Sequence, residues 1–479
     1  MWGLCERKEL YLIGIGGTAM GNLAVAMSRA GWRVGGSDAG VYPPVSGLLE
    51  EAGIGVDSPA EVGGLASWKG GVFVVGNAVS RGHPQVEWLM ENPGERRLSF
   101  PEFMGEFLLR RCRNLVVAGT HGKSTTSAVA ARLLADAGEP AGWFVGGVMA
   151  DGTPALSGDG SERYFVIEGD EYDSAFFDKR SKFVHYRPQV LLLNNLEFDH
   201  ADIFRDEEDV RRSFRQVIAL VPPGGLILYN GDDPRLASML PVRWTRCSSF
   251  GTGAANDFRV GHRAGSGRTT IRIQPRRGGG AEPLTVESPL IGSFNVRNVA
   301  GAALAVRELC PALADRRGFD LTGFAGLRRR QEVLFRSARR ILVEDFAHHP
   351  TAIAEALGAL REAFPGWRLH AMVEPRSNTM RTNRFQDRLA AALTLADSAT
   401  LAPVHRREAI PAADRLDPER VAESLRSRGG RFRICAEEDD LAEAFREGLG
   451  PEPVLTVVFS NGAFGGKVPG FLDILRSGA

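Results

Sequence analysis

Short apolar runs alternate with longer amphipathic or alanine-rich stretches along most of the chain. A run of four to six apolar residues before a turn predicts a strand, and a 3.6-residue apolar period predicts a helix. The predicted strands cover residues 10–15, 32–34, 115–118, 164–168, 190–194, 226–229, 341–344, 369–373 and 454–459. Two predicted helices cover residues 207–220 and 295–309. Another ends near residue 29, and three more start near residues 123, 350 and 384. This strand–helix alternation predicts an α/β fold with three units in series.

Residues 251–285 break this pattern, because they are rich in glycine and arginine and alternate at 270–273, which predicts an antiparallel hairpin. At 479 residues the chain is too long for one core. We expect three α/β domains, at residues 1–108, 109–325 and 326–479. Linkers are expected near residues 105–113 and 323–332.

Overall charge and cysteine usage exclude several classes of protein. The formal net charge is zero and the pI is near 7.1, so nothing global attracts the chain to nucleic acid or to a membrane. Its cysteines, Cys5 among them, are scattered without a C-x-x-C pair, which is typical of reduced thiols. No apolar leader or stretch of about 18 apolar residues occurs. We expect a cytoplasmic protein.

The strand at 115–118 leads into Gly119, Thr120, His121, Gly122, Lys123, Ser124 and Thr125. A glycine-flanked loop that delivers Lys-Ser to a helix start is typical of a nucleoside triphosphate site. Lys123 is expected to reach the β/γ-phosphates and Ser124 to hold Mg²⁺. The loop is shorter than the common G-x-x-x-x-G-K-[ST] pattern. A chance Gly-Lys-Ser at an ordinary turn remains the alternative.

A second glycine-rich turn, with Gly14, Gly16, Gly17 and Thr18, follows the first predicted strand, and Asp38 follows the next. This arrangement is typical of dinucleotide-binding units, in which the acidic residue accepts ribose hydroxyls. A Rossmann-type unit without a nucleotide is the alternative.

Glu168 ends a predicted strand, and parallel strands end at the same sheet edge as the phosphate loop. We therefore expect Glu168 and Ser124 to share a Mg²⁺ ion, because carboxylate and hydroxyl oxygens suit that ion. His200, flanked by Asp199 and Asp202, is either a second metal ligand or an ordinary loop histidine. Asp173 is expected in a solvated acidic loop.

The third predicted unit adds basic and imidazole groups. Pro350 at a helix start is expected to turn His348 and His349 toward the cleft at the strand edge. The run at 328–330 offers guanidiniums for phosphate or carboxylate, although a surface basic run is the alternative. Arg376 and Arg381 follow another strand, where a carboxylate substrate would need them. Neither a serine nucleophile elbow nor a Cys/His zinc spacing is present.

In this order, the motifs resemble the ATP-dependent muramyl ligases of bacterial cell-wall metabolism, the Mur ligases, over essentially the whole chain. The matching segments are residues 14–20, 119–126, 168–173, 195–200, 292–298, 329–330 and 345–350. Within the family, four more segments are similar to the murein peptide ligase branch, which attaches L-alanyl-γ-D-glutamyl-meso-diaminopimelate to UDP-N-acetylmuramate during peptidoglycan recycling. These are residues 38–46, 77–82, 374–380 and 460–466.

The resemblance implies a three-domain architecture, with a Rossmann-like domain at 1–108, a central P-loop ATPase-like domain at 109–325 and a second Rossmann-like domain at 326–479. Its implied ligands are ATP, Mg²⁺ (two ions), UDP-N-acetylmuramate and a murein tripeptide, bound by a monomer or weak homodimer. It implies catalytic roles for Lys123, Glu168 and His200, and metal binding by Ser124, Glu168 and His200. ATP contacts are implied for residues 119–125, Asn298, Arg330, Asp345 and His348. UDP-sugar contacts are implied for Gly14, Gly16, Gly17, Thr18, Asp38, Asn77 and Arg81. Acceptor-peptide contacts are implied for Phe346, Arg376, Ser377, Asn378 and Arg381.

The expected reaction transfers the γ-phosphoryl group of ATP to the lactyl carboxylate, and the peptide amine then attacks the acyl phosphate. The nearest alternative is the L-alanine-adding ligase of the same family. Two departures from those relatives are Phe294, where they usually have His, and Arg376-Ser377, which replaces their His-Arg. A nucleotide-sensing protein without turnover and a nicotinamide-dependent oxidoreductase are alternatives from other classes.

Overall fold

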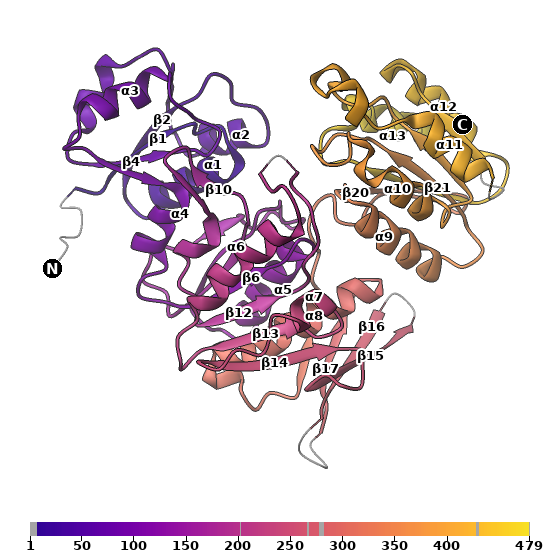
Figure 1. Cartoon of the computed structure of the whole chain (residues 1–479), viewed down its shortest axis with the longest axis horizontal. Helices are drawn as coiled ribbons and strands as arrows, with labels where there is room; N and C mark the ends of the chain where they lie inside the picture. The colour runs from indigo at the N-terminus through magenta and orange to yellow at the C-terminus, as the bar shows by residue number, and fades with distance from the viewer. Residues whose placement is uncertain (1–6, 202, 266–267, 277–281, 428–430, 479) are drawn as a thin grey trace.

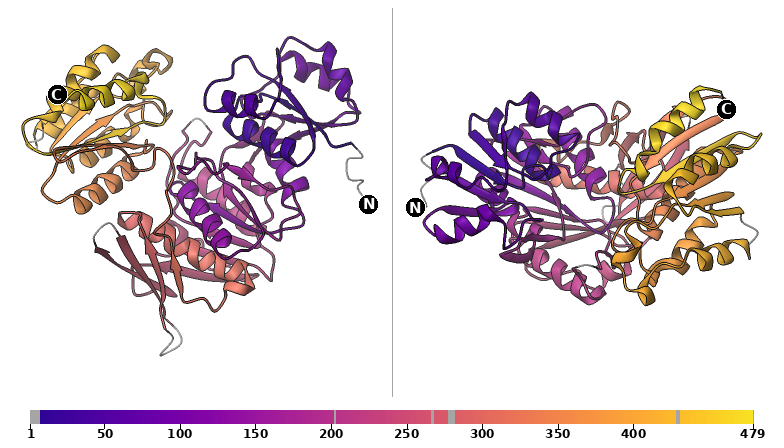
Figure 2. Two further views of the ribbon diagram at one scale, coloured as in Figure 1. Left: turned by 180° about the vertical axis from the view of Figure 1, so that it is seen from behind. Right: turned by 90° about the horizontal axis from the view of Figure 1, so that it is seen from above.

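The structure is a computed structural model that describes residues 7–201, 203–265, 268–276, 282–427 and 431–478. Within these ranges, successive parts of the chain form three sheets flanked by helices, which appear as indigo, magenta and orange-to-yellow regions in Figure 1. The N-terminal and C-terminal regions lie on opposite sides of the central one in both views of Figure 2.

The N-terminal sheet is parallel, with the order β3-β2-β1-β4-β5. Its strands are β1 Glu9–Ile13, β2 Arg33–Ser37, β3 Val56–Asp57, β4 Val72–Val75 and β5 Arg96–Ser99, and its helices are α1 Thr18–Arg29, α2 Val45–Glu51 and α3 Pro84–Glu91. The glycine-rich turn predicted from the sequence joins β1 to α1 at the carboxyl edge of this sheet.

The central sheet has the order β18-β17-β16-β15-β14-β13-β12-β6-β9-β7-β8. Its strands are β6 Arg113–Ala118, β7 Ala141–Phe144, β8 Leu156–Ser157, β9 Tyr164–Gly169, β12 Val190–Leu193, β13 Leu226–Asn230, β14 Arg246–Gly251, β15 Phe258–Gly265, β16 Arg268–Pro275, β17 Leu284–Ser288 and β18 Gly318–Asp320. Its helices are α5 Lys123–Asp136, α6 Glu207–Ala219, α7 Pro234–Ala237 and α8 Ser293–Leu309, and β10 Asp173–Ala175 pairs separately with β11 Asp178–Ser181.

Strands β9, β6 and β12 are parallel neighbours in the middle of this sheet. Their carboxyl ends therefore meet at one edge, which places the loops after them side by side. The antiparallel pairing of β15 with β16 confirms the hairpin that the alternation predicted.

The C-terminal sheet has the order β19-β20-β24-β21-β22-β23, with β19 antiparallel to β20. Its strands are β19 Glu332–Arg336, β20 Arg340–Asp345, β21 Arg368–Val373, β22 Ser398–Leu401, β23 Arg431–Ile434 and β24 Val454–Phe459. Its helices are α9 Pro350–Ala363, α10 Gln386–Leu393, α11 Pro418–Arg426, α12 Leu441–Leu449 and α13 Val468–Arg476. The helix expected from residue 384 starts as a 3₁₀ turn over Asn383–Phe385, and α10 follows it.

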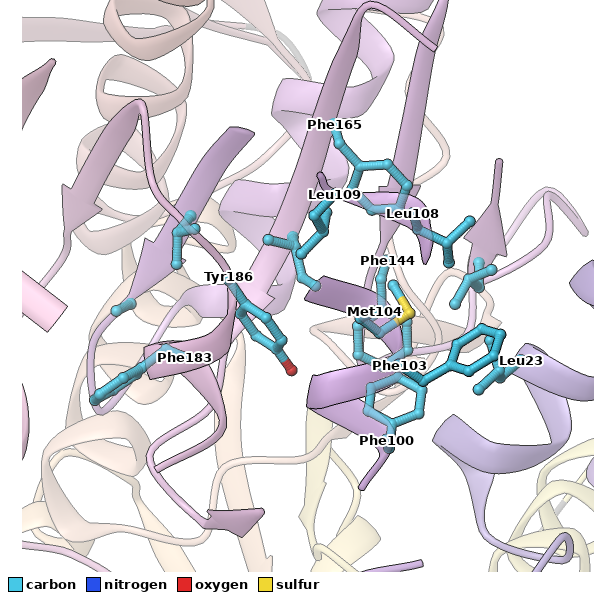
Figure 3. Packing of buried hydrophobic residues seen from close by; sticks show 14 of the residues in the cluster. Leu23, Phe100, Phe103, Met104, Leu108, Leu109, Phe144, Phe165, Phe183 and Tyr186 are labelled. Atoms are coloured by element: carbon cyan, nitrogen blue, oxygen red, sulfur yellow. The ribbon is translucent and has the colours of Figure 1, made fainter. Parts of the chain in front are cut away.

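A large apolar cluster joins the N-terminal region to the central region. Leu23 of α1 and Phe103 of α4 (Phe100–Phe103) pack toward Phe144 and Phe165 of the central sheet, as Figure 3 shows. The backbone also comes close here, because a Cβ on Gly105 would lie 2.5 Å from the carbonyl oxygen of His185. The C-terminal sheet has apolar clusters of its own.

Within the described residues, every helix is too short or too polar to cross a membrane. Cys112, Cys247, Cys310 and Cys435 are free thiols, as their spacing predicted, whereas Cys5 lies outside the described residues.

Candidate functional site

The loop at residues 119–122, called the phosphate loop after the role expected of it, joins β6 to α5 through two glycines with positive φ. Gly119 has φ +146°, and Gly122 has φ +80° at the N-cap of α5. A Cβ on Gly122 would lie 2.5 Å from Oδ1 of Asn298, a buried residue of α8. Glycine is therefore required there both by the backbone conformation and by the close approach of α8.

The segment after β12 holds this loop in shape. The backbone N–H of His121 donates to Asn195 Oδ1 at 2.8 Å, and Asn195 Nδ2 donates to the His121 carbonyl at 3.1 Å. Asn194 Nδ2 donates to Thr126 Oγ1 of α5 at 3.0 Å. The loop therefore keeps its conformation through side chains of the neighbouring strand.

Lys123 lies in a buried network of opposite charges. Its Nζ lies 2.8 Å from Glu171 Oε2, and Glu171 Oε1 lies 3.2 Å from His200 Nε2. Burial alone would lower the pKa of Lys123, but the charges of Glu171, Asp170 and Glu168 outweigh it and raise that pKa. The lysine is therefore a cation at neutral pH. Asp170 in turn forms an ion pair with Lys182 at 2.6 Å.

Ser124 and Glu168 are brought together, as the sequence predicted. Ser124 Oγ donates to Glu168 Oε1 at 3.1 Å, and the N–H of Gly146 donates to Glu168 Oε2 at 2.7 Å. A Cβ on Gly146 would lie 2.9 Å from this carboxylate, so a glycine leaves room for it. A hydroxyl and a fixed carboxylate are oxygen donors of the kind that Mg²⁺ prefers.

His200 adopts a positive φ of +56° in the loop after β12. Its ring lies 4.3 Å from that of Tyr172, and Asp199 Oδ1 accepts its backbone N–H at 2.8 Å. Burial alone would lower the pKa of His200, but the hydrogen bond and charge of Glu171 raise it. His200 thus pairs with Glu171 rather than directly with Glu168. Asp202 lies outside the described residues, and Asp173 pairs with the exposed Lys179.

A cavity of about 630 Å³ lies over the phosphate loop and is lined from all three regions. The N-terminal region contributes Thr18, Ala19 and Pro44; the central region contributes residues 120–125, Gly146, Glu168, Phe294 and Asn298; the C-terminal region contributes Asp345, Phe346, His348 and His349. Arg330, at the junction of the central and C-terminal regions, completes the lining. Pro350 takes the N1 position of α9, as predicted, with His349 as the buried N-cap.

The loop after β20 forms the C-terminal wall of this cavity. Asp345 accepts the backbone N–H groups of Gln331 at 2.9 Å and Ala347 at 2.7 Å. The guanidiniums of Arg329 and Arg330 lie 5.2 Å and 4.8 Å from the ring centre of Phe346. Phe346, for which the resemblance implied a contact with the acceptor peptide, lines this larger cavity together with Arg330.

A smaller cavity of about 280 Å³ adjoins the larger one. It is lined by Tyr172, Asp199, His200, His348, Arg376, Ser377, Asn378, Thr379, Arg381, His405, Arg406 and Asn461. Tyr172, Asp199, His200 and His348 line both cavities, which therefore meet at these four side chains. Three guanidiniums gather here, and the sequence had pointed to Arg376 and Arg381 but not to Arg406.

Arg376 is held from two sides. Its Nη1 lies 3.4 Å from both Glu374 Oε1 and His405 Nδ1. A Cβ on Gly462 would lie 2.2 Å from the Arg376 side chain, so the glycine makes room for it. Arg381 donates to Asn378 Oδ1 at 2.6 Å and to the carbonyl of His405 at 3.3 Å.

In the N-terminal region, Gly14 has φ +87°, which suits the tight turn after β1. Asp38 Oδ2 accepts the N–H of Gly16 at 2.8 Å, and Asp38 Oδ1 accepts that of Gly40 at 3.2 Å. Both carboxylate oxygens therefore already accept hydrogen bonds from the backbone, one of them from the glycine-rich turn. Arg81 is exposed and paired with Glu87 at 2.8 Å, and Asn77 is also exposed. Of the implied UDP-sugar residues, Thr18 lines the larger cavity.

Sequence reasoning missed several side chains of the site. Glu171 lies two positions from Asp173 in the same acidic loop, and only its burial distinguishes it. Glu197 contacts both the phosphate loop and the C-terminal region, and Asp199 accepts a hydrogen bond from Thr379 Oγ1 at 2.8 Å. The cluster of carboxylates around His200 was the available signal.

Three family models match successive parts of the chain: the Mur ligase family catalytic domain over residues 9–111, the Mur ligase middle domain over 117–306, and the Mur ligase glutamate ligase domain over 329–462. The UDP-N-acetylmuramate–L-alanyl-γ-D-glutamyl-meso-2,6-diaminoheptandioate ligase of Escherichia coli (strain K12) is 37% identical over 481 residues, covering 98% of this chain and 99% of that protein.

Two further proteins bear on the comparison. The crystal structure of a murein peptide ligase from Psychrobacter arcticus 273-4 is similar with a TM-score of 0.67 and 31% identity, covering 98% of each chain. The UDP-N-acetylmuramate–L-alanine ligase of Chlorobium luteolum (strain DSM 273) is 31% identical over 470 residues, covering 96% of this chain and 95% of that protein.

Proposed function

This chain belongs to the Mur ligase family, and from that premise we propose that it joins L-alanyl-γ-D-glutamyl-meso-diaminopimelate to UDP-N-acetylmuramate at the expense of ATP. It is then an acid–amino-acid ligase of peptidoglycan recycling that acts on two small molecules. The observation that carries this proposal is the meeting of the two cavities. The larger contains the phosphate loop, and the smaller gathers three guanidiniums.

The charge of the smaller cavity favours the tripeptide over L-alanine as acceptor. The tripeptide has three free carboxylates, whereas L-alanine has one. Arg376, Arg381 and Arg406 supply a matching number of guanidiniums, which bind carboxylates through two parallel N–H bonds. Phe294 and Arg376 also stand where the alanine-adding relatives usually have other residues, as noted from the sequence.

In the first step, the lactyl carboxylate oxygen attacks the γ-phosphorus of ATP, and ADP leaves with the electrons of the broken P–O bond. Lys123 and the N-terminus of α5 stabilise the charge on the transferred group. Ser124 and Glu168 are the residues that would hold Mg²⁺, which neutralises phosphate charge when bound. His200 and its partner Glu171 would serve a second ion at the same edge.

In the second step, the peptide amine attacks the carbonyl carbon of the acyl phosphate, inorganic phosphate leaves with the electrons of the broken C–O bond, and the amine proton passes to His200 or a nearby carboxylate. The guanidiniums of the smaller cavity would hold the acceptor so that its amine enters between His200 and His348, where the cavities meet. Asp345, Phe346 and Arg330 would cover the nucleotide and exclude water from an intermediate that hydrolyses readily.

The test is ADP release with Mg²⁺, UDP-N-acetylmuramate and a panel of acceptors, with the product identified by mass spectrometry. Two extra carboxylate pairs at about 1.5–3 kcal/mol each predict a preference for tripeptide over L-alanine of at least about 100-fold in kcat/KM. Preference for L-alanine would instead establish the alanine-adding alternative. Amide formation should stop when EDTA removes the divalent ion.

Lys123→Ala separates an enzyme from a nucleotide-sensing protein. We expect this substitution to lower kcat by about 100-fold or more, because a charge aimed at the transferred group is lost. Binding of UDP-N-acetylmuramate, measured by calorimetry, should persist. A wild-type chain that binds the UDP-sugar but forms no amide would contradict the proposal.

A further inference from the structure

Glu197 lies where the phosphate loop meets the C-terminal region. Its backbone N–H donates to Thr120 Oγ1 at 2.8 Å, and the same hydroxyl donates to the Glu197 carbonyl at 3.1 Å. Its carboxylate Oε2 lies 3.2 Å from His121 Nε2. The residue is therefore attached to two consecutive residues of the loop that is expected to bind ATP.

The same carboxylate is approached by two helices of the C-terminal region. His349 Nδ1, at the N-cap of α9, lies 3.4 Å from Glu197 Oε2, and Arg388 Nη2 of α10 lies 3.4 Å from Oε1. Arg388 also donates to Thr351 Oγ1 of α9 at 2.8 Å. This hydrogen bond joins α10 to α9 at the point where both helices contact Glu197.

The surroundings set this contact apart from a surface ion pair. The Glu197 side chain is 13% exposed and that of His349 is 1% exposed. Burial lowers the pKa of His349 to about 3, and its Nδ1 accepts the backbone N–H of Thr351 at 3.3 Å, so Arg388 is the cation that the C-terminal region brings to the carboxylate. A charge removed from water in this way contributes only while its partners stay in place. Any movement of α9 and α10 away from the loop leaves the carboxylate with His121 alone.

We propose that Glu197 is a positioning residue that couples the seating of the C-terminal region to the shape of the phosphate loop. This inference rests on the proposed ligase function. Phosphoryl transfer is then fastest when α9 and α10 already cover the site. The acyl phosphate therefore forms after the acceptor amine is bound nearby and water is excluded. Without this link, the acyl phosphate forms in a more open site, and water competes with the amine.

The experiment compares Glu197→Gln with the wild-type chain under saturating tripeptide, with ADP and amide product measured in the same sample. The wild type should release about one ADP per amide. Glu197→Gln keeps the shape but loses the charge, so we expect kcat to fall at least about tenfold and the ratio of ADP to amide to rise to about two or more. The KM for ATP should change by less than about threefold, because Lys123 and Ser124 are untouched.

The matched control is Arg361→Gln. Arg361 of α9 forms an ion pair with Asp397 at 2.9 Å within the C-terminal region, and neither residue lines the two cavities of the site. This variant should keep a ratio of ADP to amide near one. Arg388→Gln should reproduce part of the Glu197→Gln effect and add little to it in the double variant, because the two side chains act through one contact. Circular dichroism and Tm confirm that each variant is folded.

An unchanged kcat and ratio in folded Glu197→Gln would overturn this inference, as would full additivity with Arg388→Gln. A wild-type chain that forms no amide with any acceptor would instead contradict the proposed function, so the two failures are distinguishable.

Discussion

The two boundaries of the central region are built from different chemistry. Toward the N-terminal region, Phe100 packs against Phe144 of the central sheet at 5.2 Å between ring centres, within an apolar cluster shared by both regions that also contains the fully buried Phe103 (Figure 3). Toward the C-terminal region, the contacts are mainly those of carboxylates with histidine, arginine and threonine, such as Asp199 with Thr379 at 2.8 Å. Smaller apolar contacts accompany them, such as Phe198 with Phe385 at 6.3 Å between ring centres.

This difference indicates which part is suited to move. Separating the N-terminal region would expose a shared core, which costs about 25 cal/mol for each Å² of apolar surface. Polar contacts can exchange their partners for water and are lost and regained at lower cost, so relative motion is the expectation at such a boundary. The C-terminal region, whose polar contacts reach the phosphate loop through Glu197, is therefore the one that can open to admit substrates and close over them.

The largest expected effect comes from the apolar boundary. Phe103→Ala should lower the free energy of unfolding by about 3–5 kcal/mol, because it leaves a cavity between two regions. Phe445→Ala, in the separate core of the C-terminal region where Phe445 stacks on Phe471 at 4.4 Å, should cost a similar amount. Hydrogen exchange distinguishes them: the first variant should lose protection in both N-terminal and central sheets, the second only in the C-terminal sheet. Loss confined to one side in Phe103→Ala would contradict a shared core.

Acidification should loosen the polar boundary first. Burial lowers the pKa of His349 to about 3 and that of His348 to about 4, below the ordinary value near 6.5. Between pH 6.5 and about 4, these histidines are therefore protonated in the unfolded or undocked chain but neutral in the closed form. The free energy of unfolding or undocking falls as the pH falls through this window. For His349 the loss at pH 5 is on the order of 2 kcal/mol. Exchange at α9 measured at pH 7 and pH 5 tests this, and His349→Gln should flatten the dependence.

A single buried hydrogen bond across the polar boundary should have a smaller effect. Thr379→Val removes the donor to Asp199 Oδ1 and should cost about 1–3 kcal/mol in docking of the C-terminal region. The control is Thr394→Val, whose hydroxyl donates to the carbonyl of Ala391 within the C-terminal region. Equal loss of Tm in both variants would show that the Asp199 contact contributes nothing specific.

The smallest structural effect is expected for Gly462→Ala. The added Cβ would lie 2.2 Å from the flexible Arg376 side chain, which must shift without loss of its charge. We expect the KM for the acceptor to rise about tenfold with little change in Tm or in the KM for ATP. An unchanged acceptor KM would argue against a role for Arg376 in acceptor binding.

Much of the candidate site could be predicted from local pattern. The glycine-flanked loop with Lys123 and Ser124, the strand that ends at Glu168 and the Pro350 helix start all arise from residues close together in the sequence. Glu171 and Glu197 could not be distinguished from other acidic loop residues, because their importance depends on burial and on partners 48 residues away or in another region. Phe346 was expected to contact the acceptor peptide, and only the structure shows that it lies beside two guanidiniums in the larger cavity.

By itself, the sequence determined the alternation of strands and helices, the glycine-flanked loop that presents Lys123 and Ser124, and the resemblance to a ligase family, because these depend on short-range periodicity and on side-chain chemistry at neighbouring positions. Only the tertiary structure decided that the N-terminal boundary is apolar and the C-terminal one polar, and that Glu197 joins the latter to the phosphate loop. Those properties depend on distances and burial between segments far apart in the chain, on which local pattern carries no information.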